Sequence, residues 1–253
     1  MRRRALPVYA AAAFAFLHLP LLILIAFSFN GGRFTAWEGF SFRWYRAAMN
    51  DAQLTEGLVN SLIIAVSAAV LSTVIGTLAA YGIWRKTARI LSGTLYLSLV
   101  TPEIVTGVSL LALFQWVFRF LHLQLGIYTV IIAHVAFSIA YVVIVISARL
   151  RNYDRTLEEA AMDLGASEWH AFSRVTLPLL APAIAAAALL ALVVSFDDYV
   201  ITSLVAGVDS ETLPMVIYAM ARRGVSPVVN AVSALIVVAF GAIILISQRL
   251  QER

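Results

Sequence analysis

Long apolar segments alternate with short polar ones along the whole chain. Six can be delimited, at about residues 8–29, 58–84, 91–118, 127–148, 181–206 and 228–247. Each approaches or exceeds the ~20 residues that a helix needs to cross the hydrocarbon core of a bilayer. Because lipid offers no partner for an unpaired backbone amide, and because the segments lack the alternation of a barrel strand, we expect helices. The pattern predicts an all-α, polytopic membrane protein with six transmembrane helices.

Composition supports the bilayer as the solvent. Of the 253 residues, 62% are hydrophobic and 13% are charged, about half of the ~25% that is usual in soluble domains. Cysteine is absent, which excludes disulfides and thiol-ligated metal sites. The first segment is longer than the ~7–15 apolar residues of a signal peptide, so we expect an uncleaved span. No repeat or linker indicates a second domain, and residues 1–253 are expected to form one transmembrane domain.

Lysine and arginine are distributed unequally between the two sides of the membrane. With the amino terminus inside, twelve lie at cytoplasmic positions and six lie outside. The positive-inside rule then predicts a multi-pass protein of the bacterial inner membrane with both termini in the cytoplasm. The net charge of +4 comes from residues between apolar segments. Because they form no continuous basic stripe, we expect no nucleic-acid partner.

The cytoplasmic loop between the fourth and fifth segments has the pattern of a short helical hairpin. Four apolar positions at i, i+3, i+4 and i+7 share one helix face: Leu157, Ala160, Ala161 and Leu164. Thr156 and Glu159 have the spacing of a capping box. Gly165 suits a left-handed helix end, and Ser167 can cap a second short helix. Either the hairpin only caps itself and rests on the membrane interface, or it docks a partner.

Three acids lie within the apolar segments. Glu103 follows Pro102 in the third segment, and Asp197 and Asp198 lie about 24 Å along the fifth. An ionised carboxylate in the bilayer costs at least ~2.5 kcal/mol, so each acid should face a partner or a watery pathway. The aspartates either cap a helix break, supported by Ser195, or pair with an arginine of another subunit, or coordinate a cation. In the last case, neighbouring aromatic rings such as that of Tyr199 offer π faces to ammonium groups.

Other chemistry finds no support in the sequence. His18 and His134 lie inside apolar segments, and neither has a second histidine or a carboxylate at i+3 or i+4. We expect each to pack or form a hydrogen bond rather than bind a metal. The chain has no nucleophile elbow, no zinc-protease motif and no phosphate-binding loop. It is therefore expected to be a non-catalytic subunit that does not hydrolyse ATP.

The loop also carries a family motif. Glu159-Ala160-Ala161, then Gly165, then the stretch VTLP at residues 175–178 have the spacing of the EAA loop and resemble the permeases of ABC importers. Further stretches resemble the PotC-type spermidine/putrescine permeases: TPEIV at residues 101–105, DLGASE at 163–168, SFDD at 195–198 and GVSPVVNA at 224–231. The resemblance implies one subunit of an ATP-driven importer that moves polyamines by alternating access.

The resemblance also implies roles for individual residues. The family associates polyamine transport with positions that here are Trp44, Glu103, Glu159, Ser195, Asp197 and Asp198. Coupling to the ATPase would fall to Glu159, Ala160, Ala161, Gly165, Leu177 and Pro178. Glu103 stands where an aspartate is expected, which lengthens the acid by one methylene. Related permeases carry opines, aminophosphonates or amino-acid-like solutes, and these remain alternative substrates.

The implied partners complete an importer. They are a homologous second permease (PotB-like), two ATPase subunits (PotA-like) docking on residues 154–178, a periplasmic substrate-binding protein (PotD-like), and the lipid bilayer. ATP and Mg²⁺ would be used by the ATPases, and this chain would bind no cofactor. An ion-coupled secondary carrier is the other hypothesis. Such carriers more often show inverted repeats and paired broken helices, which the sequence does not display.

Overall fold

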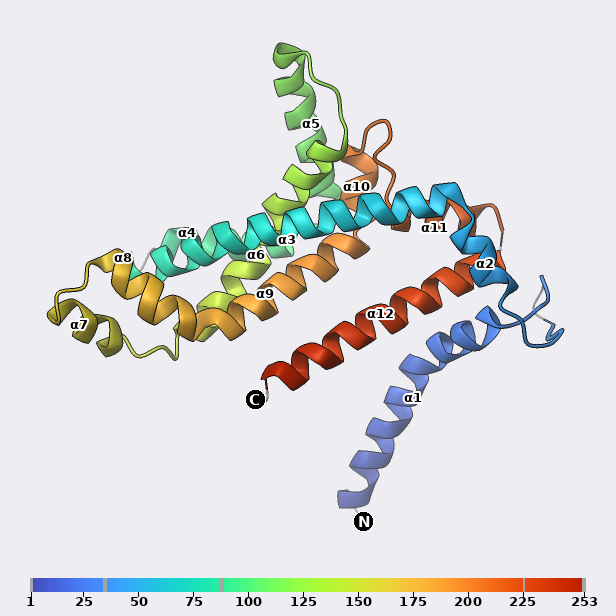
Figure 1. The fold of residues 1–253 in the computed structure, drawn as a ribbon, viewed down its shortest axis with the longest axis horizontal. Helices are drawn as coiled ribbons and strands as arrows, with labels where there is room; N and C mark the ends of the chain where they lie inside the picture. The colour runs from blue at the N-terminus through green and yellow to red at the C-terminus, as the bar shows by residue number, and fades with distance from the viewer. Residues whose placement is uncertain (1, 34–35, 87–88, 225, 252–253) are drawn as a thin grey trace. The chain divides into compact units, whose positions relative to one another are not determined.

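The fold is all-α, as the sequence predicts. The computed structural model describes residues 2–33, 36–86, 89–224 and 226–251, and these ranges contain helices and no strand longer than one isolated bridge. The helices, shown in Figure 1, are α1 Arg2–Ser28, α2 Arg43–Met49, α3 Ala52–Lys86, α4 Arg89–Val100, α5 Glu103–Leu121, α6 Ile127–Leu150, α7 Thr156–Asp163, α8 Glu168–Ala171, the π-helical turn η1 Phe172–Thr176, α9 Leu177–Asp197, α10 Val200–Val205, α11 Leu213–Arg222 and α12 Pro227–Gln251.

Five stretches within the described ranges are long and apolar enough to cross a membrane. They are Leu6–Ser28, Ala52–Lys86, Glu103–Leu121, Ile127–Leu150 and Glu168–Asp197, with Pro227–Ile243 as a shorter apolar helix. The count of six is therefore approximate. Many large apolar side chains on these helices are exposed in the isolated chain, among them Phe16, Val70 and Trp116, as expected for surfaces that face lipid or other subunits.

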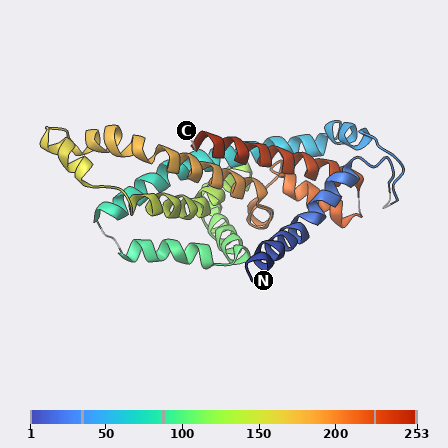
Figure 2. The ribbon, with the colours of Figure 1, turned by 90° about the horizontal axis from the view of Figure 1, so that it is seen from below.

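Two of the predicted spans are broken, which corrects the expectation of continuous helices. The third predicted segment divides into α4 and α5 at Thr101 and Pro102, and Figure 2 shows the chain turning between these helices. Proline has no backbone N–H and its ring clashes with the preceding turn, so the break falls where the sequence disfavours a helix. The fifth segment divides at Asp198 and Tyr199, between α9 and α10. The hydrophobic pattern continues through both breaks and does not reveal them.

The described chain forms two compact units, residues 1–56 with 216–253 and residues 57–215. In the first unit, α12 packs against α1 and α2. In the second, α6 packs against α9, and α10 packs against α5 and α6. One core of the second unit joins α3, α6 and α9 through buried Ala80, Ile146 and Leu180, and α3 and α9 run alongside each other in Figure 1. That the chain is a single domain stays a prediction.

A second core in the same unit fixes α10 and the turn that follows it. Ile201 and Val205 of α10 are buried against Phe114 of α5 and Val130 of α6. Beyond α10, Gly207 lies so close to the α5–α6 connection that an added Cβ would stand 1.8 Å from the carbonyl oxygen of Leu125. Only glycine fits there without a backbone shift.

Substituting this glycine should destabilise the second unit. We expect Gly207→Ala to lower the free energy of unfolding by at least about 1–3 kcal/mol, because the new methyl meets backbone that cannot rotate away. Thermal unfolding of the purified protein measures the change. Gly82→Ala in α3 is the matched control, since a Cβ there meets nothing within 4 Å and helix propensity favours alanine. Equal midpoints for the two variants would contradict the packing described.

Candidate functional site: a hollow between two helix breaks

A hollow of about 370 Å³ lies in the second unit where the two broken helices meet. Its polar and aromatic lining comes from α4, α5, α6, α9 and α10 and includes Ser98, Thr101, Glu103, Thr106, Phe137, Tyr141, Asp197, Asp198 and Tyr199. Three of these residues are acids, and none of the lining residues that the structure describes is a lysine or an arginine. Its charge therefore favours a cation.

Glu103 and Asp197 are the two acids whose side chains are exposed in this hollow. Glu103 is the first residue of α5, directly after Pro102. The positive end of a helix dipole stabilises a carboxylate there. Asp197 is the last residue of α9, where the negative end of the dipole and the neighbouring Asp198 both oppose its charge. A bound cation would relieve that repulsion.

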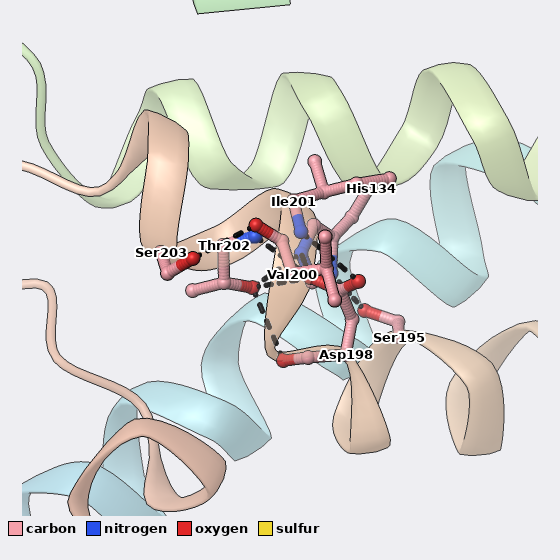
Figure 3. Close-up of polar contacts among 7 residues, drawn as sticks. All are labelled: His134, Ser195, Asp198, Val200, Ile201, Thr202 and Ser203. Atoms are coloured by element: carbon pink, nitrogen blue, oxygen red, sulfur yellow. Dashed lines mark hydrogen bonds and ion pairs between the residues drawn. The ribbon is translucent and has the colours of Figure 1, made fainter. Parts of the chain in front are cut away.

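Asp198 has a different environment from its neighbour, and Figure 3 shows its polar contacts. Its side chain is only 5% exposed and caps the first turn of α10. The carboxylate accepts hydrogen bonds from the backbone N–H groups of Ile201 (3.4 Å) and Thr202 (2.7 Å) and from the Thr202 hydroxyl (2.7 Å). Asp198 therefore holds the break between α9 and α10, one of the structural roles that the sequence left open.

His134 of α6 connects both sides of this break. The imidazole is 1% exposed, its Nδ1 lies 2.7 Å from the Ser195 hydroxyl, and its Nε2 lies 2.9 Å from Thr202 Oγ1 and 3.4 Å from Asp198 Oδ2. A ring protonated on Nε2 satisfies every contact, since Ser195 can donate to Nδ1. Ser195 is thus buried beside the break, where it supports His134. The expectation of a hydrogen bond for His134 is confirmed.

Aromatic rings complete the lining. Tyr199, named from the sequence, lies between α9 and α10, while Phe137 and Tyr141 come from α6. Ring faces attract ammonium groups. Phe137 and Tyr141 were missed by the sequence analysis, because nothing local distinguishes them from other aromatic residues in an apolar helix.

Trp44 belongs to the other unit and anchors the turn after α1. It is 8% exposed, and its indole Nε1 donates to the carbonyl oxygen of Asn30 at 2.7 Å. The Arg43 guanidinium lies 4.2 Å from the centre of its ring. Trp44 also lines a hollow of its own with Arg33 and Arg223. These arginines disfavour direct contact between this indole and a cation, and a pathway role for Trp44 stays a prediction.

The loop that carries the EAA motif is a helical hairpin. Gly165 ends the first helix with a φ of 90°, which favours glycine. Ser167 caps α8 by accepting a hydrogen bond from the backbone N–H of His170. Leu177 and Pro178 are the first two residues of α9. These helix boundaries confirm the sequence pattern.

The predicted capping box is wrong. Asp154 Oδ1 accepts hydrogen bonds from the Thr156 backbone N–H (3.0 Å) and hydroxyl (2.8 Å), so Thr156 is already engaged. Glu159 instead lies 3.3 Å from Arg155. The bonds from Thr156 hold the pKa of Asp154 below its usual value. The cap is therefore ionised at neutral pH and is lost as the pH falls through that lowered pKa.

The apolar face of α7 is uncovered in this chain. Leu157 is 45% exposed, Leu164 is 90% exposed, and Trp169 of α8 is 65% exposed. The one buried residue of α7 is instead an acid that the sequence analysis did not single out, Glu158. The hairpin thus turns a polar side chain toward its own bundle and an apolar face away from it.

Comparison with known protein families identifies the family of this chain. The family described as "Binding-protein-dependent transport system inner membrane component" matches residues 72–253. The chain belongs to this family. It is a multi-pass permease subunit of the inner membrane, and the relatives below are named as transport proteins.

Similar proteins in the family are named as permeases of polyamine transport systems. The spermidine/putrescine transport system permease protein PotC of Haemophilus influenzae is 38% identical over 244 residues, which cover 95% of this chain and 93% of that protein. PotC of Escherichia coli K12 is also 38% identical over 244 residues, covering 95% and 91%. The putrescine transport system permease protein PotI of the same strain is 40% identical over 247 residues, covering 95% and 88%.

Solved structures share the fold. A chain of a bacterial ABC transporter that imports alginate matches with a TM-score of 0.68 at 17% identity, over 100% of this chain and 97% of its own. A chain of the methionine transporter MetNI in an inward-facing conformation matches with a TM-score of 0.66 at 18% identity, over 78% and 94%. These matches show that the chain shares the fold of chains from ABC transporters.

Proposed function

We propose that this permease moves polyamines such as spermidine and putrescine from the periplasm to the cytoplasm. The observation that carries the proposal is the pair of exposed carboxylates, Glu103 and Asp197, in a hollow with aromatic walls whose described lining contains no lysine or arginine. Polyamines carry several ammonium groups, which carboxylates pair with and ring faces attract. The polyamine names of the relatives support the same substrate class.

Each pathway residue has its own part in this proposal. Glu103 and Asp197 bind ammonium groups, and Tyr199 with Tyr141 and Phe137 contacts the methylene chain. Asp198 and Ser195 act through the break that they stabilise with His134. Glu103, longer by one methylene than the aspartate expected there, shifts the spacing between the acids and so tunes which polyamine fits best.

Energy for transport comes from partner subunits. In the proposed importer, two ATPase subunits of the PotA kind use ATP and Mg²⁺ and dock on residues 154–178. The exposed apolar face at Leu157, Leu164 and Trp169 supports such docking, because large exposed apolar side chains outside the membrane are typical of interaction sites. Within this loop we assign coupling to Glu159, Ala160, Ala161, Gly165, Leu177 and Pro178. The positive-inside bias supports cytoplasmic termini and a cytoplasmic loop.

Two further partners complete the transporter. A homologous second permease of the PotB kind would form the other half of the membrane pathway. A periplasmic binding protein of the PotD kind would deliver the substrate, and one of the solved relatives is an importer in complex with its periplasmic protein. Alternating access would expose the hollow to the two sides of the membrane in turn.

Uptake by the reconstituted transporter tests the proposal. Proteoliposomes that contain all four kinds of subunit are expected to accumulate radiolabelled spermidine and putrescine only when ATP is enclosed with the ATPases. Unlabelled opines, aminophosphonates and amino acids at the same concentration should not compete. If these solutes are transported and polyamines are not, the polyamine proposal is wrong although the family assignment stands.

A further inference from the structure

Glu158 is an acid, and it is the one buried residue of α7. It is 2% exposed and lies on the side of α7 that faces the helix bundle. Two hydroxyl groups donate to its carboxylate, the Tyr81 hydroxyl from α3 at 3.2 Å and the Thr176 hydroxyl from η1. One side chain of α7 therefore connects the hairpin to two other elements, α3 and the start of α9.

A fourth side chain extends this network. The Tyr153 hydroxyl lies 3.1 Å from Thr176 Oγ1. Burial raises the pKa of Tyr153 above its usual value, so its hydroxyl keeps its proton at neutral pH. Thr176 has one hydroxyl proton and donates it to Glu158, so its oxygen accepts a hydrogen bond from the Tyr153 hydroxyl. The hydroxyl protons of Tyr153, Thr176 and Tyr81 are therefore all directed toward the carboxylate. Each carboxylate oxygen of Glu158 accepts one donor, Oε2 from Tyr81 and Oε1 from Thr176.

Phe172 of η1 also packs on the Tyr81 ring, with centroids 4.4 Å apart, but the ion pairs of the hairpin are exposed. Arg85 of α3 pairs with Glu168 of α8 at 3.0 Å, but the Glu168 side chain is 73% exposed. Arg155 and Glu159 pair within the loop itself. Exposed ion pairs yield readily to water and salt, whereas a buried carboxylate cannot leave its donors without a large desolvation penalty. Among the polar contacts of α7, the one that must move with the helix is therefore the buried one at Glu158.

We infer that Glu158 is the positioning residue through which a displacement of α7 reaches α3 and α9. The inference rests on the proposed function, since it takes an ATPase to displace α7. It differs from the coupling role assigned to Glu159, whose side chain is exposed and pairs with Arg155. Glu158 transmits the movement inward because α9 leads directly from Thr176 to Asp197 and the hollow.

The absence of cysteine from this chain allows a test that does not depend on the solute. Ser98→Cys places one thiol in the hollow. In the full complex, the rate at which a maleimide modifies this thiol is measured with and without ATP and vanadate, and ATP hydrolysis is measured in parallel. We expect nucleotide to change the modification rate at least tenfold in this background.

Glu158→Ala is expected to reduce this nucleotide response to less than twofold while ATP hydrolysis continues. Glu158→Gln keeps one acceptor oxygen for one donor and should give an intermediate response. Tyr81→Phe should add little to Glu158→Ala, because both remove the same contact. Glu56→Ala, an exposed acid at the start of α3, is the control and should keep the full response.

The other outcomes distinguish a failure of the role of Glu158 from a failure of the proposed function. A full response in Glu158→Ala overturns the role of Glu158 and leaves the proposed function intact. If Glu158→Ala does not assemble, a full response in both Glu158→Gln and Tyr81→Phe overturns it equally. A background complex whose thiol does not respond to nucleotide contradicts the proposed coupling itself, and with it this inference.

Discussion

The Glu103→Gln, Asp197→Asn double variant is expected to lose polyamine uptake by at least about 100-fold. A hydrogen bond to a charged group contributes about 1.5–3 kcal/mol, and every ~1.4 kcal/mol is a factor of ten. Each acid removed should therefore lower the initial rate of uptake about tenfold or more. Both substitutions preserve size at exposed positions, so the yield of assembled complex and its ATPase activity should change little.

A matched variant separates this effect from a general loss of negative charge. Glu56→Gln removes a charge from an exposed position outside the hollow and should transport at the unmodified rate. Radiolabel uptake into proteoliposomes measures all three proteins. If the double variant transports within about threefold of the unmodified complex, these acids do not bind the substrate, and the cation-binding role of the hollow is contradicted.

Alanine substitution of the two adjacent aspartates is expected to lower the stability of the protein to very different extents. Asp198→Ala removes the cap of α10, which leaves the buried Thr202 backbone N–H without its acceptor and takes the carboxylate away from His134. A lost cap costs about 0.5–2 kcal/mol and an unsatisfied buried polar group about 1–3 kcal/mol, so we expect a loss of roughly 2–4 kcal/mol in the free energy of unfolding. Asp197→Ala changes an exposed side chain and should alter stability by no more than about 0.5 kcal/mol.

Thermal unfolding of the detergent-purified complex checks this difference. Asp198→Asn keeps one oxygen for the Thr202 backbone N–H and should fall between the two alanine variants. His134→Ala should lower the unfolding midpoint, since it removes the group that joins Ser195 to Thr202. Equal midpoints for Asp197→Ala and Asp198→Ala would show that Asp198 does not hold the break.

The spans could be predicted from the sequence because their length and apolar composition are local properties. The breaks could be predicted only in part. Pro102 indicates a helix break wherever it stands, and the sequence analysis noted it without dividing the third segment. No proline or glycine accompanies the break at Asp198. At that break, Asp198 caps α10. In the sequence, an acid that caps a helix in the middle of an apolar run cannot be distinguished from a buried acid that pairs with a distant residue.

The pairing of His134 with Asp198 is a tertiary contact between residues 64 positions apart, and motif spacing could not reveal it. One signal was present. An ionisable residue in an apolar span is expected to have a partner, and this chain has few candidates for such a pair. Matching the histidines and acids of different spans would have proposed His134 and Asp198 together.

Glu158 was missed because the local sequence pattern is misleading at this helix. The apolar spacing on α7 predicts which face is buried in an ordinary amphipathic helix. This helix is reversed, since Leu157 and Leu164 are exposed and Glu158 is buried. The hydroxyls that satisfy Glu158 come from α3 and η1. Only the folded chain brings them together.

The most direct test of substrate binding in the hollow is electron cryo-microscopy of the complete transporter with spermidine. The predicted result is elongated density in the hollow between Glu103 and Asp197, with ammonium nitrogens about 2.7–2.9 Å from the carboxylate oxygens. Spermidine density elsewhere on the pathway, with the hollow empty in every state observed, would contradict the role of these two acids.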